Sequence, residues 1–372
     1  MSFLLNEDQT LLRESVLVFV SEQSPVSRQR ALRDSHAPLG FAPELWQQAV
    51  ELGWPATALP EEAGGLAMGY PGLGAMFELM GRHLAALPLL SHTVLAGALL
   101  TRLSDAAQQE QWQPLLLQGE ERFALALDES QRHQPQGFKT TAVANAGGWE
   151  LSGEKYFVID GVGARWLIVA AQVEGKSALF MVDSQAIGVQ IHALNLADSR
   201  NHARIQLQKV QLPASARLQL TDTQAALEQA LDCARICLAA EGLGIVRESF
   251  ERTVAYLKER VQFDVAIGSF QALQHRVARL YTEIELLDSC VRGALAAVDA
   301  QSPDLAQLAS LAKARASDLC EKLLNEAVQL HGGIGVTDEF DLGLFLKRAR
   351  VIQQTLGDAL FHRDRYARLK GF

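Results

Sequence analysis

Trp166-Leu-Ile-Val-Ala170 and Ala178-Leu-Phe-Met-Val-Asp183 are the stretches that decide the fold of this 372-residue chain. Each is a short apolar run of the length expected for a buried strand. Arg204-Ile-Gln-Leu-Gln-Lys-Val-Gln-Leu212 partly alternates apolar and polar side chains, and Asn145-Ala-Gly-Gly148 predicts a hairpin loop. Because strand follows strand without an intervening helix, residues 121–220 are predicted to form an antiparallel β-barrel or sandwich.

The sequence on either side of this region changes to a helical period. Residues 7–22 carry apolar side chains close to a 3.6-residue repeat, and helical patterning returns from 224 to about 260 without a proline. Gly242 and Gly244 lower the helical propensity of this second stretch. We therefore predict an α+β multidomain protein with an N-terminal helical domain (1–120), a middle β domain (121–220) and a C-terminal four-helix bundle (221–372).

Composition narrows the classes of function. The net charge is −9 and the 34 basic residues form no stripe, so a nucleic-acid partner is not expected. The N-terminus lacks a signal-peptide pattern and no apolar run reaches the length of a membrane span, so we expect a cytoplasmic protein without membrane insertion. The four cysteines are expected to be buried thiols, with no metal site.

Four motifs along the chain resemble those of the acyl-CoA dehydrogenase family. Arg260-Val-Gln262-Phe263-Asp-Val-Ala-Ile267-Gly-Ser-Phe270-Gln271 is similar to the family's Arg–polar–Phe–Gly signature with a following Phe-Gln, and Gln329-Leu-His-Gly332-Gly333-Ile-Gly335 is similar to its Gln-x-x-Gly-Gly-x-Gly segment. Leu52-Gly53-Trp54 leading to Pro60-Glu61-Glu62-Ala-Gly64-Gly65 resembles its N-terminal loop. Gly153-Glu154-Lys155 resembles its β-domain strand. The motifs occur in family order with family spacing.

This resemblance implies FAD as cofactor, lying extended across a subunit interface. Arg260 would then donate a charge-assisted pair of hydrogen bonds to the pyrophosphate, with Gln262 beside it. Gln329, Gly332 and Gly333 would contact the adenosine half, and Phe263 would pack near the flavin or fill the core. Two other interpretations stay open, namely Arg260 as a solvated cation at a helix C-terminus and the glycines as a helix stop.

The family reaction is α,β-dehydrogenation of an acyl-CoA thioester, in which a carboxylate removes the α-proton. Most members carry this glutamate in a Tyr-Glu-Gly-Thr segment, but Leu356 stands at that place here. A subgroup that includes isovaleryl-type enzymes places the base just before an arginine on the long helix, where this chain has Ala234 before Arg235. Both positions are therefore inert in this chain.

Glu241 is the candidate base that remains on this helix. It follows Leu227, Leu231, Ala234 and Leu238 at alternating spacings of four and three, so it falls on an otherwise apolar stripe. A carboxylate on a buried stripe is costly unless it is paired or functional. The alternatives are an ion pair with Arg235 or Arg247, or exposure to solvent, and Asp358 is the second candidate base.

The departures from the family pattern resemble a bacterial subgroup in which catalytic and supporting chains form heteromers, some acting on steroid side-chain thioesters. We expect an FAD-dependent acyl-CoA dehydrogenase that passes electrons to an electron-transferring flavoprotein and forms a homo- or hetero-oligomer, such as a dimer of dimers. The alternatives are a non-catalytic partner subunit and an oxygen-using oxidase or monooxygenase of the same fold.

Overall fold

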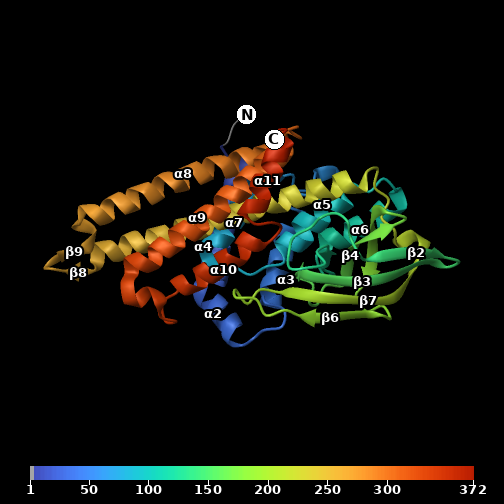
Figure 1. The fold of residues 1–372 in the computed structure, drawn as a ribbon, viewed down its shortest axis with the longest axis horizontal. Coiled ribbons are helices and arrows are strands. Elements are labelled where there is room, and N and C mark those ends of the chain that lie inside the picture. The colour runs from blue at the N-terminus through green and yellow to red at the C-terminus, as the bar shows by residue number, and fades with distance from the viewer. Residues whose placement is uncertain (1–3) are drawn as a thin grey trace. The chain divides into compact units, whose positions relative to one another are not determined.

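The computed structural model describes residues 4–372, and they change from helix to strand and back to helix as the periodicity predicts (Figure 1). The first helical stretch begins at Glu7 under a capping box made by Asn6 and Gln9. Its helices are α1 Glu7–Gln23, α2 Val26–Asp34, α3 Pro43–Glu51, α4 Gly69–His83, α5 Gly97–Leu100 and α6 Ala106–Gln118, with short helical turns η1 Trp54–Ala56 and η2 Glu61–Ala63 and a π-helix, η3, at Leu90–Ala96.

The strands form one seven-stranded sheet in the order β1-β4-β2-β3-β7-β6, with β5 paired to β4. Most neighbours are antiparallel, as predicted, whereas β1 and β2 each pair with β4 in parallel. The expected hairpin at 145–148 joins β2 to β3. The strands are β1 Phe123–Ala126, β2 Thr141–Asn145, β3 Gly148–Ile159, β4 Trp166–Val173, β5 Lys176–Asp183, β6 Val189–Ala193 and β7 His202–Pro213, followed by the turn η4 Ala214–Ala216.

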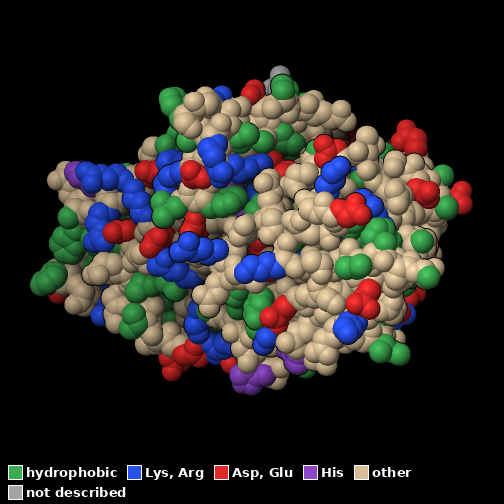
Figure 2. All heavy atoms as spheres, turned by 45° about the vertical axis from the view of Figure 1, so that its right-hand side comes forward, with side chains coloured by type: hydrophobic (Ala, Val, Ile, Leu, Met, Phe, Trp, Pro, Cys, Tyr) green, Lys and Arg blue, Asp and Glu red, His purple; other side chains and the backbone are tan. Residues whose placement is uncertain are grey.

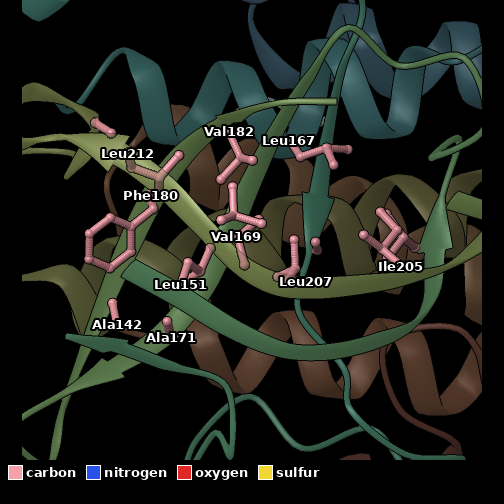
Figure 3. Packing of buried hydrophobic residues seen from close by; sticks show 14 of the residues in the cluster. Ala142, Leu151, Leu167, Val169, Ala171, Phe180, Val182, Ile205, Leu207 and Leu212 are labelled. Atoms are coloured by element: carbon pink, nitrogen blue, oxygen red, sulfur yellow. The ribbon is translucent and has the colours of Figure 1, made fainter. Parts of the chain in front are cut away.

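One face of this sheet carries its hydrophobic core. The two runs that predicted the fold supply Leu167, Val169, Phe180 and Val182, which pack among side chains from β3 and β7 (Figure 3). Burial of such side chains contributes about 1.5–3 kcal/mol each. The apolar sequences of β4 and β5 therefore fix the sheet that organises this part of the chain.

The last stretch is helical. Helix α7 runs from Thr223 to Glu259 without a break, and Gly242 and Gly244 lie inside it. The remaining elements are a small hairpin of β8 Val261–Gln262 and β9 Val265–Ala266, the turn η5 Ile267–Ser269, α8 Gln271–Asp299, α9 Leu305–His331, the turn η6 Gly332–Val336, α10 Leu342–Gln354 and α11 Ala359–Leu369. The hairpin lies where α7 ends and α8 begins (Figure 1).

Contacts between residues group the chain into two compact units. The helical unit contains residues 4–31, 70–85 and 235–372, and the sheet unit contains residues 32–69 and 86–234. The first helical stretch thus contributes to both units. The three-domain division at 120 and 220 stays a prediction, although the changes of secondary structure fall close to those positions.

Within the helical unit, α4 and α7 approach each other at the backbone level. A Cβ added to Gly244 would lie 1.9 Å from the Glu78 carbonyl oxygen, and one added to Gly81 would lie 2.1 Å from the Glu241 carbonyl oxygen. Only glycine permits this approach, because any larger residue would push the two helices apart. Gly242 and Gly244, which both lower the helical propensity of α7, therefore differ in role. Only at Gly244 does the close approach of α4 require a glycine.

We expect Gly244→Ala to destabilise the protein by about 1–3 kcal/mol, because the added methyl group overpacks the crossing of α4 and α7. Urea unfolding followed by circular dichroism measures this change. Gly242→Ala is the matched control, since its Cβ would meet the nearest atom, Cys320 Sγ, at 3.3 Å. Equal stability of the two variants would contradict a backbone-level crossing.

Candidate functional site

Leu356 lies in the turn between α10 and α11, at the position where the resemblance places the usual base. The residue is buried, and its φ of 56° is in the left-handed region. A branched side chain adopts this conformation only where its surroundings impose it. Ala234, at the alternative base position on α7, is also buried. Neither side chain can accept a proton.

Three fully buried donors hold this turn. Lys313 Nζ donates to the carbonyl oxygens of Gly357 at 2.9 Å and Gln353 at 3.3 Å. The Leu356 carbonyl oxygen accepts from Arg235 Nε at 3.2 Å and His362 Nε2 at 3.1 Å. The backbone of residue 356 is thus fixed independently of its side chain.

Lys313 is the clearest electrostatic feature of this cluster. Its ammonium group is completely buried in α9, and the loss of solvation lowers its pKa from 10.5 to about 7. Asp358, the second candidate base, uses its carboxylate to accept a hydrogen bond from the backbone N–H of Phe361 at 2.8 Å, which caps α11.

Glu241 is buried, as its place on the apolar stripe predicted, with 2 % of its surface exposed. Its carboxylate accepts two hydrogen bonds from Arg348 on α10, Nε to Oε1 and Nη2 to Oε2, both at 2.7 Å. The buried ion pair weighed from the sequence is therefore present, although its partner is Arg348 and not one of the suggested Arg235 and Arg247, and the solvent-exposed alternative is wrong. Arg247 instead pairs with Glu78 and Asp288. A bidentate guanidinium is a geometry typical of a stable buried pair.

Arg260, Gln262 and Phe263 lie together on the hairpin of β8 and β9. All three are exposed, and the Phe263 ring shows 86 % of its surface. Phe263 and Asp264 take φ values of 53° and 61°, so both central residues of this two-residue loop are left-handed. Asp264 stands where the family usually has glycine, and here it adopts the conformation that glycine favours.

Gln329, Gly332 and Gly333 lie at the C-terminal end of α9 and in the turn that follows. All three are exposed, and a Cβ added to either glycine would meet no atom within 4 Å among the described residues. This open backbone leaves room for a ligand or a neighbouring chain. Gly332, at φ 64°, also ends α9, so the helix-stop interpretation holds for the backbone and is compatible with a contact.

An aromatic stack connects these two groups of residues. The ring of His331, next to Gly332, lies 4.5 Å from that of Tyr256, one helical turn before Arg260. The Phe340 ring lies 4.7 Å from that of His331, and His331 Nδ1 donates to the Ala327 carbonyl oxygen at 2.8 Å. The stack fixes the end of α7 against the end of α9, so the structure joins two motifs that lie far apart in the sequence.

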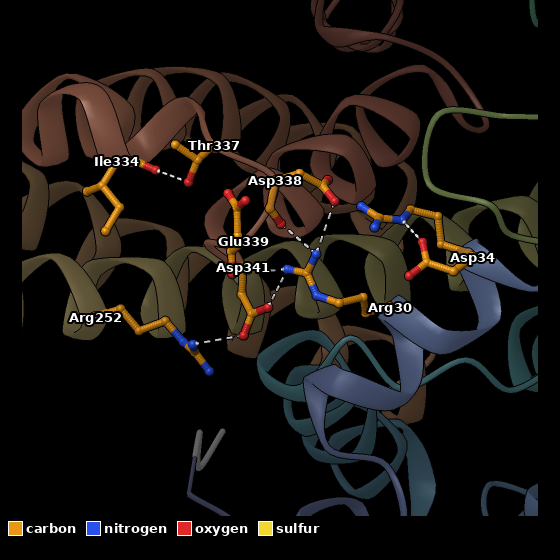
Figure 4. A network of polar contacts seen from close by, with 9 residues as sticks. Arg30, Asp34, Arg252, Ile334, Thr337, Asp338, Glu339 and Asp341 are labelled. Carbon is orange, nitrogen blue, oxygen red and sulfur yellow. Dashed lines mark hydrogen bonds and ion pairs between the residues drawn. The ribbon is translucent and has the colours of Figure 1, made fainter.

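A polar network then holds the segment that follows the glycines (Figure 4). Arg30 of α2 donates to Asp341 at 2.8 Å and to the Asp338 carbonyl oxygen at 2.5 Å. Arg252 of α7 approaches the other Asp341 carboxylate oxygen to 3.6 Å. Because a carboxylate bridges two arginines from different helices, the chain after the glycine turn is tied at two points.

The distribution of charge on the surface does not mark a further binding site. Acidic and basic side chains lie side by side over the face displayed in Figure 2. All four cysteines are free thiols, three of them buried and Cys290 partly exposed. Within residues 4–372, no group of three or more His, Cys, Asp or Glu side chains could hold a metal ion. Among the same residues, no helix is long and apolar enough to cross a membrane.

Known proteins are similar to this chain in sequence and in fold. Residues 6–120 match the acyl-CoA dehydrogenase N-terminal domain and residues 224–369 match the acyl-CoA dehydrogenase C-terminal domain. The acyl-CoA dehydrogenase IpdE2 of Mycolicibacterium smegmatis is 30 % identical over 355 residues, covering 95 % of this chain and 96 % of the relative.

Two solved structures show the same relationship. A variant of the Tcur3481-Tcur3483 steroid ACAD has a TM-score of 0.88 and 31 % identity, and covers 99 % of this chain and 98 % of that one. The ChsE4-ChsE5 complex from Mycobacterium tuberculosis has a TM-score of 0.90 and 26 % identity, with both chains covered completely.

The fold, with its N-terminal helices, middle β half-barrel and C-terminal helices, and these matches define a class of flavoprotein oxidoreductases. The chain belongs to the acyl-CoA dehydrogenase family, whose cofactor is FAD. The predicted family, fold class and cofactor are thereby confirmed.

Residues Arg348, Lys313 and His362 were not singled out from the sequence. Lys313 carried a usable signal, because it shares an apolar stripe of α9 with Ala309, Ala316 and Cys320, as Glu241 does on α7. Arg348 and His362 stand among several charged and polar neighbours in α10 and α11, where the sequence alone does not separate inward from outward positions.

We expect Glu241→Met to destabilise the protein by about 3–5 kcal/mol, because the largely buried guanidinium of Arg348 loses the carboxylate that accepts two of its hydrogen bonds. The double variant Glu241→Met/Arg348→Met removes both charges and should recover most of that loss. Thermal and urea unfolding of the single and double variants measure the coupling. Additive losses would show that the two side chains do not interact.

The buried Lys313 makes stability depend on pH. Between about pH 7 and 10 the unfolded chain keeps a proton on this amine that the folded chain has released, so its contribution to stability rises with pH. The free energy of unfolding of the wild type minus that of Lys313→Met should increase by about 1.4 kcal/mol per pH unit inside this window.

Lys322→Met is the control for this pH dependence, since Lys322 is exposed on the same helix. The same difference measured with this variant gives the slope against which that of Lys313 is compared. A flat difference for Lys313 would mean that its amine is solvated and charged in the folded protein.

Proposed function

We propose that the protein takes part in the α,β-dehydrogenation of an acyl-CoA thioester, with FAD as the hydride acceptor. The observation that carries this proposal is the contact between the rings of Tyr256 and His331, which brings the motif beginning at Arg260 close to the motif beginning at Gln329. Arg260, Gln262 and Gln329 offer charged and neutral donors there, and none of the three is buried. Exposed donors in a single chain suit a cofactor that is shared with a neighbouring chain.

These residues fit an extended dinucleotide. The guanidinium of Arg260 matches the paired oxygens of a pyrophosphate, and the Gln262 amide adds a neutral donor. The backbone at Gly332 and Gly333 leaves space for close approach, and the exposed Phe263 ring offers an apolar surface. FAD, when bound, would accept the β-hydrogen of the acyl group as hydride. The α-proton then requires a separate acceptor.

Two arrangements can supply that proton acceptor. In the first, Glu241 acts as the base, which requires Arg348 to move away because it occupies both carboxylate oxygens; Asp358 would similarly have to release its helix cap. In the second, this chain is a supporting subunit and a partner chain carries the base. The Glu241–Arg348 pair favours the second arrangement, because breaking a buried bidentate pair in every turnover is costly.

The relatives support a heteromeric, steroid-related role. The solved structures include the ChsE4-ChsE5 complex and a variant of the Tcur3481-Tcur3483 steroid ACAD. We propose a bulky acyl-CoA as substrate on this basis, with electrons passing to an electron-transferring flavoprotein. Oxygen as the acceptor is the remaining alternative. The four free thiols are compatible with a reducing cytoplasm.

The absorbance spectrum of the purified chain, recorded alone and then during anaerobic addition of saturated acyl-CoAs, tests this proposal. A yellow chain that bleaches would support the first arrangement, and Glu241→Gln should then abolish bleaching while FAD stays bound. A colourless chain, or a yellow chain that bleaches only after mixing with a partner chain, would support the second. A chain that remains colourless and inactive with every candidate partner would overturn the proposal.

We expect Arg260→Met to weaken FAD binding about tenfold or more, because a charge-assisted contact to the pyrophosphate is lost. Fluorescence titration with FAD measures the dissociation constant, in the chain alone or in its complex. Arg279→Met, at another exposed arginine on α8, is the control and should leave FAD binding unchanged. An equal effect of both substitutions would remove Arg260 from the cofactor site.

A further inference from the structure

The face of α7 that ends at Arg260 carries a row of side chains. Arg252, Tyr256 and Arg260 follow one another at intervals of four residues, so they leave the helix on nearly the same side. Arg260 comes directly after Glu259, the last residue of α7, and its N–H still donates to the Tyr256 carbonyl oxygen at 2.8 Å. The row therefore leads, one helical turn at a time, to the guanidinium that is proposed to bind the pyrophosphate.

The segment that carries the glycine turn runs along this row. The centre of the His331 ring lies 4.5 Å from that of the Tyr256 ring. Further along the same segment, an Asp341 carboxylate oxygen lies 3.6 Å from Arg252 Nη1 (Figure 4). The segment thus contacts two successive turns of α7. Gly332, the first residue of η6, is bonded directly to the residue that makes the first of these contacts.

Several groups hold the His331 ring in place. Only 3 % of the residue is exposed, and the Phe340 ring lies 4.7 Å away, centre to centre. Its Nδ1 donates to the Ala327 carbonyl oxygen at 2.8 Å. A Cβ added to Gly335 would lie 3.1 Å from His331 Cβ, so the glycine turn folds back over this residue. The ring therefore fills the space between the end of α7 and the glycine turn.

The contact between the two rings is the stronger of the two links to α7. Asp341 and Arg252 each keep about a third of their side chains exposed, so solvent screens their attraction. The His331 ring is removed from solvent, and this burial lowers its pKa from the ordinary value, so the imidazole is neutral at pH 7. A neutral buried ring packs against another ring as an apolar group does.

We propose that His331 is a positioning residue of the cofactor site, whose ring sets the separation between Arg260 and the backbone of Gly332 and Gly333. The inference rests on the proposed function, because it takes these residues as contacts of one dinucleotide. An extended ligand meets two protein groups at once only when their spacing matches its own. A site whose spacing is fixed in advance binds more tightly than one that is ordered on binding.

Fluorescence titration with FAD, in the chain alone or in its complex, tests the role of the ring. We expect His331→Ala to weaken binding about tenfold, because the spacer between the two motifs is lost. His331→Phe should restore most of the affinity, since a phenyl ring keeps the contacts with Tyr256 and Phe340 and loses only the bond to Ala327. A phenylalanine variant as weak as the alanine variant would overturn the inference.

A double-mutant cycle shows whether His331 acts through Arg260. Arg260→Met should weaken FAD binding about tenfold in the wild type but only about twofold in the His331→Ala background, because the guanidinium is no longer held at the right distance. Additive losses would overturn the inference and leave the cofactor site intact. An Arg260→Met variant that binds FAD as tightly as the wild type would instead overturn the cofactor site itself, and the inference with it.

Tyr281→Ala is the matched control, because it removes a ring that lies 6.0 Å from the Phe250 ring elsewhere in the helical unit. Its FAD affinity should equal that of the wild type. An effect as large as that of His331→Ala would show a general loss of packing and overturn the inference. Thermal midpoints show that each variant is folded. Tyr256→Leu, which removes the ring from the α7 side, takes the place of His331→Ala in the cycle if that variant does not fold.

Discussion

The cost of burying charge governs the helical unit more than any other constraint. An ion taken out of water must regain its hydrogen bonds inside the protein, and the helices of this unit meet that requirement through one another. Glu241 on α7 depends on Arg348 of α10, and Arg247 of α7 depends on α4 and α8. Lys313 relies on carbonyl oxygens of the turn after α10. The helices are thus positioned by electrostatic matching as well as by apolar packing.

This constraint also bears on chemistry. A base for α-proton removal needs a carboxylate that can accept a proton, and the pairing of Glu241 removes the readiest one in the helical unit. The same unit keeps the turn around Leu356 rigid through Lys313, Arg235 and His362. A turn so firmly held around a leucine indicates that the backbone geometry at this position matters even without an acidic side chain.

The sequence predicted those features that repeat along the chain. Apolar runs placed β4 and β5, and the stripe on α7 placed Glu241 inside, because burial follows directly from periodicity. It did not predict the partner of Glu241, since Arg348 lies 107 residues away and no local pattern links them. The contacts among the rings of Tyr256, His331 and Phe340 were not predicted either, because no local pattern links Tyr256 to the other two residues. The family motif grouped Arg260, Gln262 and Phe263 as cofactor contacts but did not predict their exposure, and the alternative that Phe263 fills the core is wrong. The left-handed conformations of Phe263 and Asp264 were not predicted, because neither residue is a glycine.

The division of the first hundred residues between two compact units has a consequence for biosynthesis. Residues 4–31 and 70–85 emerge from the ribosome early, yet the rest of their unit begins only at residue 235. Their apolar faces cannot pack against residues 235–372 until residues 86–234 have been translated. The sheet unit, whose last segment ends at residue 234, is complete sooner. During synthesis the N-terminal helices of the helical unit therefore expose apolar side chains after the sheet unit has been completed. This exposure favours assistance by a chaperone and makes early termination products prone to aggregation.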